Sequence, residues 1–500
     1  MVDSRERPIS IAILAVGGQG GGVLTNWLVD VAEANGYLAQ STFVAGVAQR
    51  TGATVYCVEM FPRDRAEAIG KDPVFTPYPV PGDVDLVVAG EMAETGRAIQ
   101  KGFVTPNITT LIASSHRIYS VLEKDALGDG IFDQAPVADA AQKAAKKFIC
   151  FDMAAAAAST GSVISSVILG AIAGSGTLPF PREAFEDAIR ASGRAVEANL
   201  AGFAAGFDGV GEHAPPRDVA IPVAEPAGPN GAALNERIDR ELPEAVRNLA
   251  LHGALRVLDY QDAKYAAAYL DRVKEISVID TGSNEYHLTA EVARQLALQM
   301  CYEDTIRVAD LKTRGERFAR IRDDVVASPD QPVHVIEYFH PRIEEICDTL
   351  PAPIGAFILN SETTQKILSP FFKKGRNIKT TGVMGFLMLY VFSKFRRFRR
   401  FTYRFKKQQE LIHDWLDRVI NAAVDDYDYA LAIAHCIEIV RGYGDTYQRG
   451  LTRYRAAVDV AAGLPPAERT RAMHRLHKAA LADEQGQVFG ETIATMETVH

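Results

Sequence analysis

The sequence is poor in the residues that build metal and redox centres. Its 500 residues include five cysteines, and none of them forms a C-x-x-C pair. Local ligands for an iron–sulfur cluster or a structural zinc site are therefore missing, so any clusters that the protein works with must lie on another chain. We predict no metal site in this chain and expect its cysteines to be buried, reduced thiols: Cys57, Cys150, Cys301, Cys347 and Cys436.

Long apolar runs and an excess of basic charge are missing as well. The longest later apolar run, 383–392, is about half of the ~20 residues that span a bilayer. The first apolar run breaks at glycines, without a signal-peptide cleavage pattern. The net charge is −9, which argues against nucleic acid as a main partner. We therefore predict a soluble, cytoplasmic protein that does not insert into membranes.

Residues 1–208 alternate between short apolar segments and helical ones. Strands that are buried on both faces of a parallel sheet have near-continuous apolar sequences. The alternation predicts an α/β, doubly wound, Rossmann-like domain with a mostly parallel sheet. The expected strands are 9–16, 37–43, 53–60, 85–89, 108–114 and 147–152, and residues 154–206 are expected to form closely packed helices rich in small residues.

The character of the chain then changes twice. Residues 209–232 are rich in Pro and Gly and are expected to form a linker. From 233 to 500, segments with a 3.6-residue period predict a mainly α-helical C-terminal domain, with one good strand candidate at 332–339. The periodic segments are 240–272, 289–310, 386–424, 428–442 and 465–483.

A cluster of glycines follows the first predicted strand. It permits a sharp turn into a helix, whose first N–H groups favour an anion. The dinucleotide fingerprint G-x-G-x-x-G fails, because Val23 or Thr25 stands at its third glycine, and the second strand ends near Gln40 without an acidic residue. An anion site and a purely structural turn both stay open. The candidate cofactor-binding residues are Gly17, Gly18, Gln19, Gly20, Gly21, Gly22, Gln49 and Arg50.

Arg50 and Glu91 have two interpretations each, and two histidines have one. Arg50, in a loop expected beside the glycine cluster, is suited to a phosphate or carboxylate of a ligand, but also to an intersubunit salt bridge. Glu91 follows a strand end, where ligands of open α/β sheets gather, and we favour a helix-capping role for it. His340 and His435 lack metal-ligand spacing with their sequence neighbours and are expected to be ordinary histidines.

Residues 394–408 form the densest basic run, with aromatic residues between the cations. One interpretation is a helix–loop whose aromatic rings pack while its cations stay in water. A contact with an acidic partner, either a larger subunit or an electron acceptor, is the second. Nucleic acid or a membrane surface is the third and the least favoured.

The motifs "LAVGGQGGG" (14–22), "FVAGVAQRTGATVYCVEM" (43–60) and "DLVVAGEMAETGRAIQ" (85–100) stand in one particular order. In this order they resemble the gamma domain of 2-oxoacid:ferredoxin oxidoreductases. Later stretches, among them 257–273 and 288–322, resemble the C-terminal extension of the long members of that family, the beta subunits of indolepyruvate ferredoxin oxidoreductases. The resemblance extends over nearly the whole chain.

The resemblance implies a subunit of an enzyme that oxidatively decarboxylates an aryl 2-oxoacid to the aryl-acetyl-CoA or the arylacetate. Thiamine diphosphate, Mg²⁺ and [4Fe–4S] clusters are then expected on a large alpha subunit, with ferredoxin or a similar protein as electron acceptor and coenzyme A as a further ligand. A heterotetramer of two large and two small subunits is expected. No catalytic residue is assigned in this chain.

The sequence agrees that thiamine diphosphate is not bound by this chain alone. Gly128-Asp129-Gly130 matches the start of a thiamine motif, but the asparagine pair expected about 25–30 residues later is absent, so we interpret these residues as a turn. Two other functions stay open: a nucleotide-binding oxidoreductase that acts alone, and a non-catalytic scaffold or binding protein.

Overall fold

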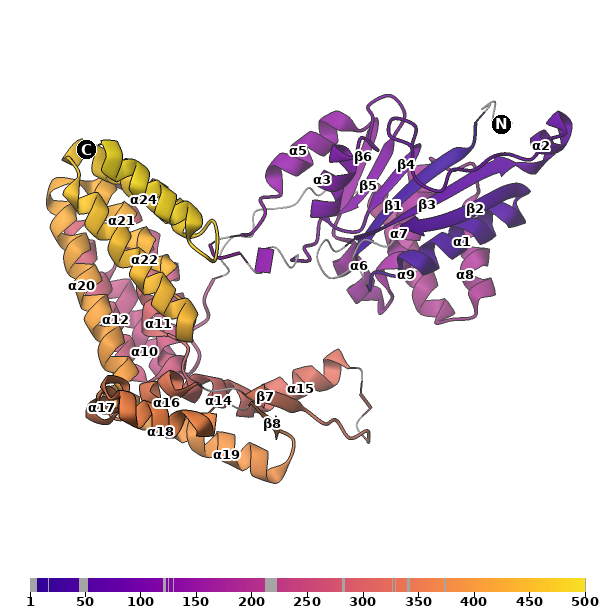
Figure 1. The fold of residues 1–500 in the computed structure, drawn as a ribbon. Coiled ribbons are helices and arrows are strands. Elements are labelled where there is room, and N and C mark those ends of the chain that lie inside the picture. The colour runs from indigo at the N-terminus through magenta and orange to yellow at the C-terminus, as the bar shows by residue number, and fades with distance from the viewer. Residues whose placement is uncertain are drawn as a thin grey trace. The chain divides into compact units, whose positions relative to one another are not determined.

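The computed structural model describes residues 7–499, apart from residue 17 and residues 45–52, 120–122, 125, 129, 212–222, 281–283, 326, 329, 340–341 and 373–374. Contacts divide the chain into two compact units, Met1–Ala220 and Ile221–His500, which are drawn in Figure 1. The division falls within the predicted linker 209–232, and the first helix of the second unit begins at Gly228.

The N-terminal unit contains a six-stranded sheet surrounded by helices, as the alternation of segments predicted. Each predicted strand is present, with ends that differ by at most two residues. The elements are β1 (Ile9–Val16), α1 (Gly21–Ala34), β2 (Tyr37–Val44), β3 (Ala53–Pro62), α2 (Arg63–Ile69), β4 (Leu86–Ala89), α3 (Met92–Gln100), β5 (Thr110–Ser114), α5 (Ala135–Ala144), β6 (Lys147–Phe151), α6 (Met153–Thr160), α7 (Ile164–Ser175), α8 (Arg182–Ser192) and α9 (Val196–Asp208).

The strand order is β2-β3-β1-β4-β5-β6. Strands β1, β4, β5 and β6 pair in parallel, whereas β3 lies antiparallel to both β1 and β2. The sheet is therefore mixed but mostly parallel, as predicted, and β3 is the strand that reverses direction. The carboxyl ends of β1, β4, β5 and β6 consequently meet at one edge of the sheet.

Both faces of the sheet are covered by helices, which explains why the strands are apolar throughout. Alternate side chains of β1 point to opposite faces: Ile11 and Ile13 pack with α1 and with α6 to α9, whereas Ala12 and Leu14 pack with α3 and α5. Figure 1 shows these two helical layers on either side of the sheet.

Helices α7 and α9 pack with their backbones in direct contact, as their small residues predicted. A Cβ added at Gly170 would lie 2.0 Å from the carbonyl oxygen of Phe203, and one added at Gly206 would lie 1.9 Å from that of Val167. Among the described residues, no single helix is long and apolar enough to cross a bilayer, and α6 with α7 meets that length and composition only as a pair bent by 115°.

The C-terminal unit is mainly helical, which confirms the prediction for this part of the chain. Its elements are α10 (Gly228–Glu241), α11 (Glu244–Tyr260), α12 (Ala263–Ile279), α13 (His287–Met300), α14 (Thr305–Thr313), α15 (Gly315–Asp324), β7 (Ile336–Phe339), α16 (Ile343–Thr349), α17 (Ala352–Asn360), α18 (Glu362–Phe372), β8 (Arg376–Lys379), α19 (Val383–Lys394), the 3₁₀ helix η3 (Phe395–Phe401), α20 (Tyr403–Asp425), α21 (Tyr427–Cys436), the 3₁₀ helix η4 (Ile437–Ile439), α22 (Gly444–Gly463), α23 (Pro466–Ala480) and α24 (Gln487–Val499). The strand predicted at 332–339 is shortened to β7, which pairs antiparallel with β8.

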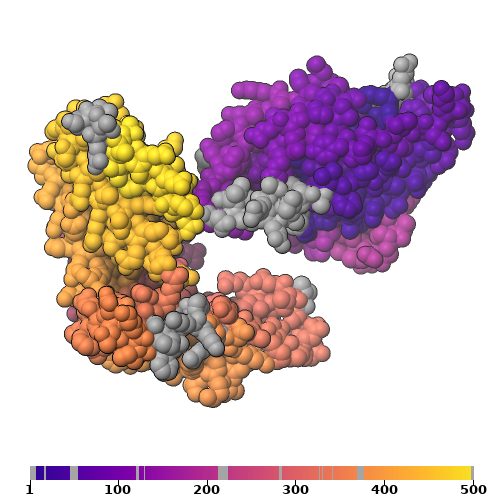
Figure 2. Space-filling view, viewed as in Figure 1, coloured from indigo at the N-terminus to yellow at the C-terminus, as the bar shows by residue number. Residues whose placement is uncertain are grey.

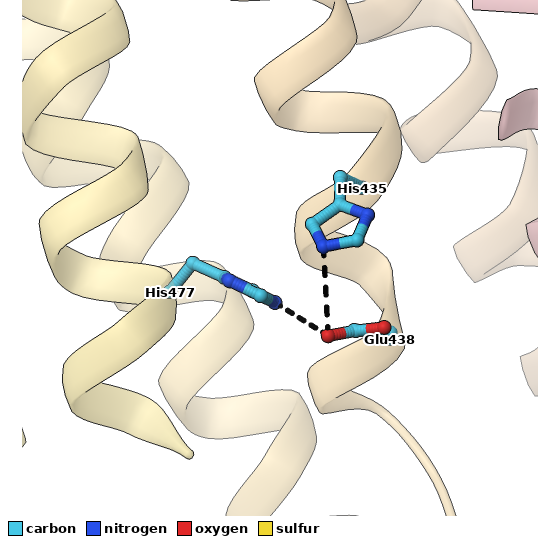
Figure 3. A group of neighbouring side chains, drawn as sticks. All are labelled: His435, Glu438 and His477. Atoms are coloured by element: carbon cyan, nitrogen blue, oxygen red, sulfur yellow. Dashed lines mark hydrogen bonds and ion pairs between the residues drawn. The ribbon is translucent and has the colours of Figure 1, made fainter. Parts of the chain in front are cut away.

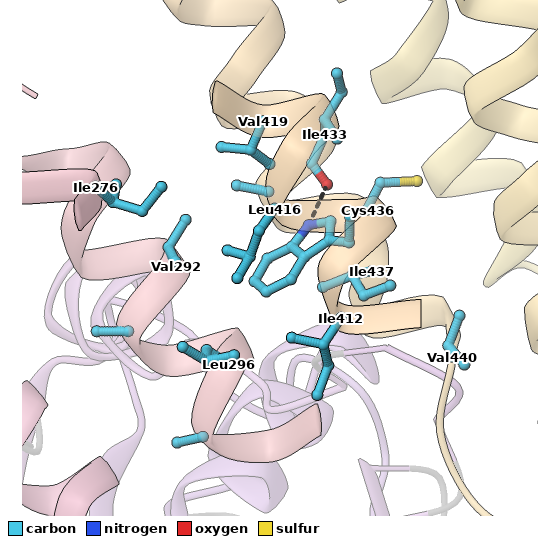
Figure 4. Packing of buried hydrophobic residues seen from close by; sticks show 14 of the residues in the cluster. Ile276, Val292, Leu296, Ile412, Leu416, Val419, Ile433, Cys436, Ile437 and Val440 are labelled. Atoms are coloured by element: carbon cyan, nitrogen blue, oxygen red, sulfur yellow. Dashed lines mark hydrogen bonds between the residues drawn. The ribbon is translucent and has the colours of Figure 1, made fainter. Parts of the chain in front are cut away.

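One apolar core joins α10 to α13 with α20 to α24. Trp415 of α20 is fully buried in it and donates its indole N–H to the carbonyl of Ile433 in α21 at 3.3 Å. Figure 4 shows this bond among the side chains of Leu296, Ile412 and Ile437.

Residues 305–401 form a separate lobe of the C-terminal unit, drawn in salmon and orange in Figures 1 and 2. Few of its apolar side chains are buried: helix α19 buries Leu389 but exposes Val383 by 82% and Met384 by 80%. An apolar surface of this kind on a folded unit marks a site of interaction.

Candidate functional site

The glycine cluster forms the turn from β1 into α1, as predicted. Gly20 caps the helix in the left-handed region, with φ 72°. A Cβ added at Gly21 would lie 2.5 Å from the ring of Tyr56 and 3.1 Å from the Cβ of Ala15, so the helix can approach the sheet only with glycine there. Gly22 is exposed, and the first turn of α1 holds no acidic residue. The positive end of α1 therefore faces solvent and favours an anion.

Gln19 turns its side chain inward, away from that solvent-facing end. The residue is 7% exposed, and its Nε2 donates to the carbonyl of Gly90 at 3.0 Å, at the end of the neighbouring strand β4. Helices α1 and α3 leave β1 and β4 toward opposite faces, so this point is the switch point where ligands of open α/β sheets bind. The amide of Gln19 fills part of that space and fastens the glycine turn to β4.

Strand β5 adds two polar residues to the same edge. Ser114 Oγ lies 2.6 Å from His116 Nδ1 and accepts the backbone N–H of Met153 at 3.1 Å. His116 Nε2 lies 3.5 Å from Gln19 Nε2. Burial lowers the pKa of His116, which keeps the imidazole neutral near pH 7. These contacts order the edge, and the neutral imidazole is able to donate or accept one proton there.

Glu91 caps helix α3, as the sequence interpretation favoured. Its carboxylate accepts the backbone N–H of Glu94 at 3.0 Å and pairs with Arg117 at 3.3 Å. Arg117 also pairs with Glu123, and its guanidinium lies 5.5 Å from the centre of the Phe132 ring. Burial raises the pKa of Glu91, and the charge of Arg117 acts in the opposite direction. The carboxylate of Glu91 and the guanidinium of Arg117 therefore both make their contacts within the fold.

Gly17, Gln49 and Arg50 lie outside the described residues, as does Asp129 of the turn 128–130. The described candidates Gly18, Gln19, Gly20, Gly21 and Gly22 form one continuous turn. Sequence reasoning missed Ser114, His116 and Arg117, although a signal was present: all three stand at or just after the end of a buried strand.

The favoured interpretation of the basic run 394–408 holds only in part: Lys394, Arg397, Lys406 and Lys407 are exposed, as it predicted, but other cations of the run are not. Arg396 and Arg399 point into the fold, where Arg396 donates to the carbonyls of Leu258 and Gln261 at 3.1 and 2.7 Å, and Arg399 donates to the carbonyl of Tyr260 at 2.8 Å. These carbonyls belong to the C-terminal turn of α11, which lacks helical donors and favours cations.

Three aromatic residues of the same run face outward, whereas Tyr403 and Phe405 are half-buried. Phe395, Phe398 and Phe401 are 48%, 60% and 69% exposed. The segment "FRRFRRF" has a three-residue period, and η3, the 3₁₀ helix that it forms, has three residues per turn. Residues three apart therefore share an edge, with phenylalanines on one edge and Arg396 and Arg399 on another. We call Phe395, Phe398 and Phe401 the phenylalanine row.

The cysteines behave largely as predicted. Cys57, Cys150, Cys347 and Cys436 are buried free thiols, and Cys301 is half-buried. Burial raises the pKa of Cys57, Cys150 and Cys301 to about 12 in each case, which keeps them protonated near neutral pH.

The structure describes one of the two histidines that the sequence analysis considered. His340 lies outside the described residues. His435 was expected to be an ordinary core or surface histidine, and the structure adds two neighbours: its Nε2 lies 3.7 Å from Glu438 Oε1, and its ring centre lies 4.7 Å from that of His477. His477 is distant in sequence, so spacing along the chain hides the cluster.

Comparisons with known proteins concern each unit separately. Residues 10–209 match the family model described as pyruvate ferredoxin/flavodoxin oxidoreductase, and residues 246–460 match a family of unknown function. No curated protein matches the chain. The family predicted from the glycine-turn motifs is confirmed for the N-terminal unit alone, whose residues 10–209 match this oxidoreductase family model.

The solved structures that are similar to the chain include the following three. A pyruvate oxidoreductase subunit from Thermotoga maritima is 17% identical with a TM-score of 0.29, and the match covers 41% of this chain and 97% of that one. A keto/oxoacid ferredoxin oxidoreductase gamma subunit from Geobacter sulfurreducens is 18% identical with a TM-score of 0.27 and coverages of 41% and 98%. A 2-oxoglutarate:ferredoxin oxidoreductase from Magnetococcus marinus is 15% identical with a TM-score of 0.29 and coverages of 44% and 34%.

Proposed function

We propose that this chain, with its 2-oxoacid:ferredoxin oxidoreductase domain at 10–209, is the small subunit of an arylpyruvate:ferredoxin oxidoreductase. Its substrates would be indolepyruvate and related aryl 2-oxoacids, converted to the aryl-acetyl-CoA or the arylacetate. The resemblance of the helical extension to that of the long indolepyruvate enzymes supports this substrate class. The family match of residues 10–209 is the observation that carries the proposal.

The sequence supports a division of labour in the complex. With five scattered cysteines and no C-x-x-C pair, this chain has no local ligands for [4Fe–4S] clusters, and it has no asparagine pair after Gly128-Asp129-Gly130. Thiamine diphosphate, Mg²⁺ and the clusters would therefore be held by a large subunit, which would pass electrons to ferredoxin or a similar acceptor.

The phenylalanine row is the surface that we assign to this large subunit. Three exposed aromatic rings on one edge of a rigid 3₁₀ helix give apolar contact area with little loss of side-chain entropy. Arg396 and Arg399 of the same helix are bound within the fold, whereas Arg397 is exposed, so the contact would be mainly apolar with a cation beside it. Two large and two small subunits would form a heterotetramer.

The glycine turn would contact an anion at the subunit interface, such as a phosphate of coenzyme A or of the cofactor. The exposed Gly22, the absence of acidic residues in the first turn of α1 and the presence of Arg50 in a nearby sequence motif support this assignment. Arg50→Ala should then lower the turnover of the complex at least tenfold, equivalent to about 1.4 kcal/mol. Arg63→Ala, at the start of α2, is a control that should leave turnover unchanged.

Co-expression with a candidate large subunit tests the proposal. The purified complex should reduce ferredoxin or an artificial dye with indolepyruvate, phenylpyruvate or 4-hydroxyphenylpyruvate, in the presence of coenzyme A. Pyruvate and 2-oxoglutarate serve as matched substrates without an aryl group, and faster turnover of either would contradict the aryl assignment.

The isolated chain provides a second measurement. It should be colourless and should retain neither iron nor thiamine diphosphate after purification. Stoichiometric iron–sulfur absorption would contradict the division of labour, and tight retention of a nucleotide would favour the alternative of an oxidoreductase that acts alone. Full activity of the large subunit without this chain would favour a scaffold.

A further inference from the structure

Three side chains of the C-terminal unit converge on one point between two helices, as Figure 3 shows. His435 lies in the last turn of α21, Glu438 follows in η4, and His477 projects from α23. The Nε2 atoms of both histidines approach the same carboxylate oxygen, Glu438 Oε1, at 3.7 Å for His435 and 2.8 Å for His477. One ligand atom from each residue lies within 4.8 Å of the other two.

The orientation of His435 is fixed from its other side. Its Nδ1 lies 2.8 Å from Oε1 of Glu291 on α13, and Gln295 Nε2 donates to that same oxygen at 2.8 Å. A carboxylate only accepts hydrogen bonds, so Nδ1 carries the proton. In the neutral ring, Nε2 therefore directs a lone pair toward Glu438. Metal-binding histidines commonly have this arrangement, in which a carboxylate orients the ring through the second nitrogen.

The convergence of these groups calls for a positive charge between them. Two imidazole nitrogens and a carboxylate oxygen repel one another as lone pairs unless a proton or a cation lies among them. The side chains are 39% (His435), 14% (Glu438) and 14% (His477) exposed, so the point is partly shielded yet open to a small ion.

We propose that His435, Glu438 and His477 bind a divalent transition-metal ion of the zinc type, and that Glu291 orients His435. Ligand atoms at 2.0–2.1 Å from a tetrahedral zinc ion lie roughly 3.3–3.4 Å apart. The two His–Glu separations of 3.7 and 2.8 Å lie on either side of that value and all three ligand atoms lie within 4.8 Å of one another, so side-chain rotations would bring them into the geometry. Imidazole and carboxylate ligands together suit Zn²⁺, and three protein ligands leave a fourth position for water.

Arg294 sets a limit on how the carboxylate binds. Its guanidinium lies 3.5 Å from Glu438 Oε2 and 3.5 Å from Glu291 Oε2. Glu438 would thus bind the ion through Oε1 alone, while Arg294 holds the second oxygen. The ion would link α21 and η4 to α23 and, through Glu291, to α13, which makes it a stabilising link near the C-terminal end of the chain.

Metal binding by the full chain tests the proposal. After treatment with a chelator and removal of the chelator, the chain is titrated with Zn²⁺ in competition with a chromophoric chelator, and with Co²⁺ as a spectroscopic probe. We expect one ion per chain, the intense visible bands of tetrahedral Co²⁺, and a higher unfolding temperature with Zn²⁺, because an ion that binds only the folded state stabilises it.

The variants separate a metal site from a hydrogen-bonded cluster. His477→Gln keeps a side-chain N–H that can donate to Glu438 but removes the ligand, so it should lose the bound ion and the Zn²⁺-dependent rise in unfolding temperature. Glu291→Gln should weaken Zn²⁺ binding about 10- to 100-fold. His474→Gln, at an exposed position of the same helix, is the matched control and should bind as the parent does.

Two results would overturn the proposal. One is a parent chain that takes up no stoichiometric Zn²⁺. The other is a His477→Gln chain that binds Zn²⁺ as tightly as the His474→Gln control, since the ion would then lie elsewhere. Unfolding of the metal-free variants shows whether each one is folded, so a loss of binding through misfolding is recognised directly.

Discussion

Arg399 and Asp304 form a buried, two-point ion pair in the C-terminal unit. Arg399 Nε lies 2.8 Å from Asp304 Oδ2, and Nη2 lies 3.1 Å from Oδ1, with side chains that are 1% and 5% exposed. Asp304 also caps helix α14, by accepting the backbone N–H of Arg307. With the carbonyl of Tyr260 bound to Nη1, one arginine connects η3, the end of α11 and the start of α14.

Removal of this guanidinium should destabilise the C-terminal unit strongly. Arg399→Met leaves the carboxylate of Asp304 buried without its partner, which we expect to lower the free energy of unfolding by about 3–5 kcal/mol. Urea unfolding is best followed by tryptophan fluorescence in a Trp27→Phe background. Trp415 is then the remaining one of the two tryptophans, and it lies in the core of this unit.

Arg397→Met is the matched control for that experiment. Arg397 belongs to the same helix and is exposed, so its replacement should change the free energy of unfolding by less than about 0.5 kcal/mol. If both substitutions lower the free energy of unfolding equally, the buried pair of Arg399 and Asp304 stabilises the fold no more than an exposed arginine does.

The glycine turn offers a pair of adjacent test positions. Gly21→Ala adds a methyl group against Tyr56 and Ala15, and we expect it to lower the free energy of unfolding by about 1–3 kcal/mol. Gly22→Ala adds its methyl group where no heavy atom lies within 4 Å, so stability should stay the same or rise slightly. Urea midpoints from circular dichroism compare the two, and a larger loss for Gly22→Ala would contradict the packing.

Asp348 should make the stability of the C-terminal unit depend on pH. Burial raises the pKa of this carboxyl to about 6, against the opposing charge of Arg404. In the unfolded chain the pKa is about 3.9. The stabilising contribution is therefore complete below about pH 4, decreases as the pH rises because the unfolded chain ionises first, and is lost by about pH 6.

Asp348→Asn removes this titration. The unfolding free energy of the variant minus that of the parent should therefore rise between pH 4 and pH 7, by on the order of 3 kcal/mol. The measurement is the difference in urea unfolding free energy at the two pH values. Glu410→Gln is the control: Glu410 lines the same surface pocket as Asp348, and this variant should show the pH dependence of the parent. If the difference in unfolding free energy between Asp348→Asn and the parent does not change with pH, the raised pKa of Asp348 is disproved.

The phenylalanine row should be needed for assembly and not for folding. Replacement of Phe395, Phe398 and Phe401 by serine should leave the unfolding of the isolated chain nearly unchanged, because all three rings are exposed. The same change should shift the complex with the large subunit toward free chains on a sizing column. Val278→Ser and Val424→Ser, at positions that are 78% and 76% exposed on α12 and α20, are matched controls outside the row.

Periodicity and local chemistry made much of the fold predictable. The six strands of the N-terminal unit are apolar along their length because they are buried on both faces, and this pattern can be read without coordinates. The close packing of α7 and α9 followed from their small residues, and the capping role of Glu91 from its place after a strand. Each of these features can be recognised from a pattern among residues that are neighbours in the sequence.

The remaining features depend on residues that are distant in sequence. The sequence predicted a helix–loop at "FRRFRRF", but only the tertiary structure decided which edge of it faces the fold, because the carbonyls that bind Arg396 and Arg399 lie at the end of α11, about 140 residues earlier. His435 and Glu438 are three residues apart, but His477 reaches them only through the packing of α21 against α23. A contact made by folding leaves no local pattern from which its partner can be identified.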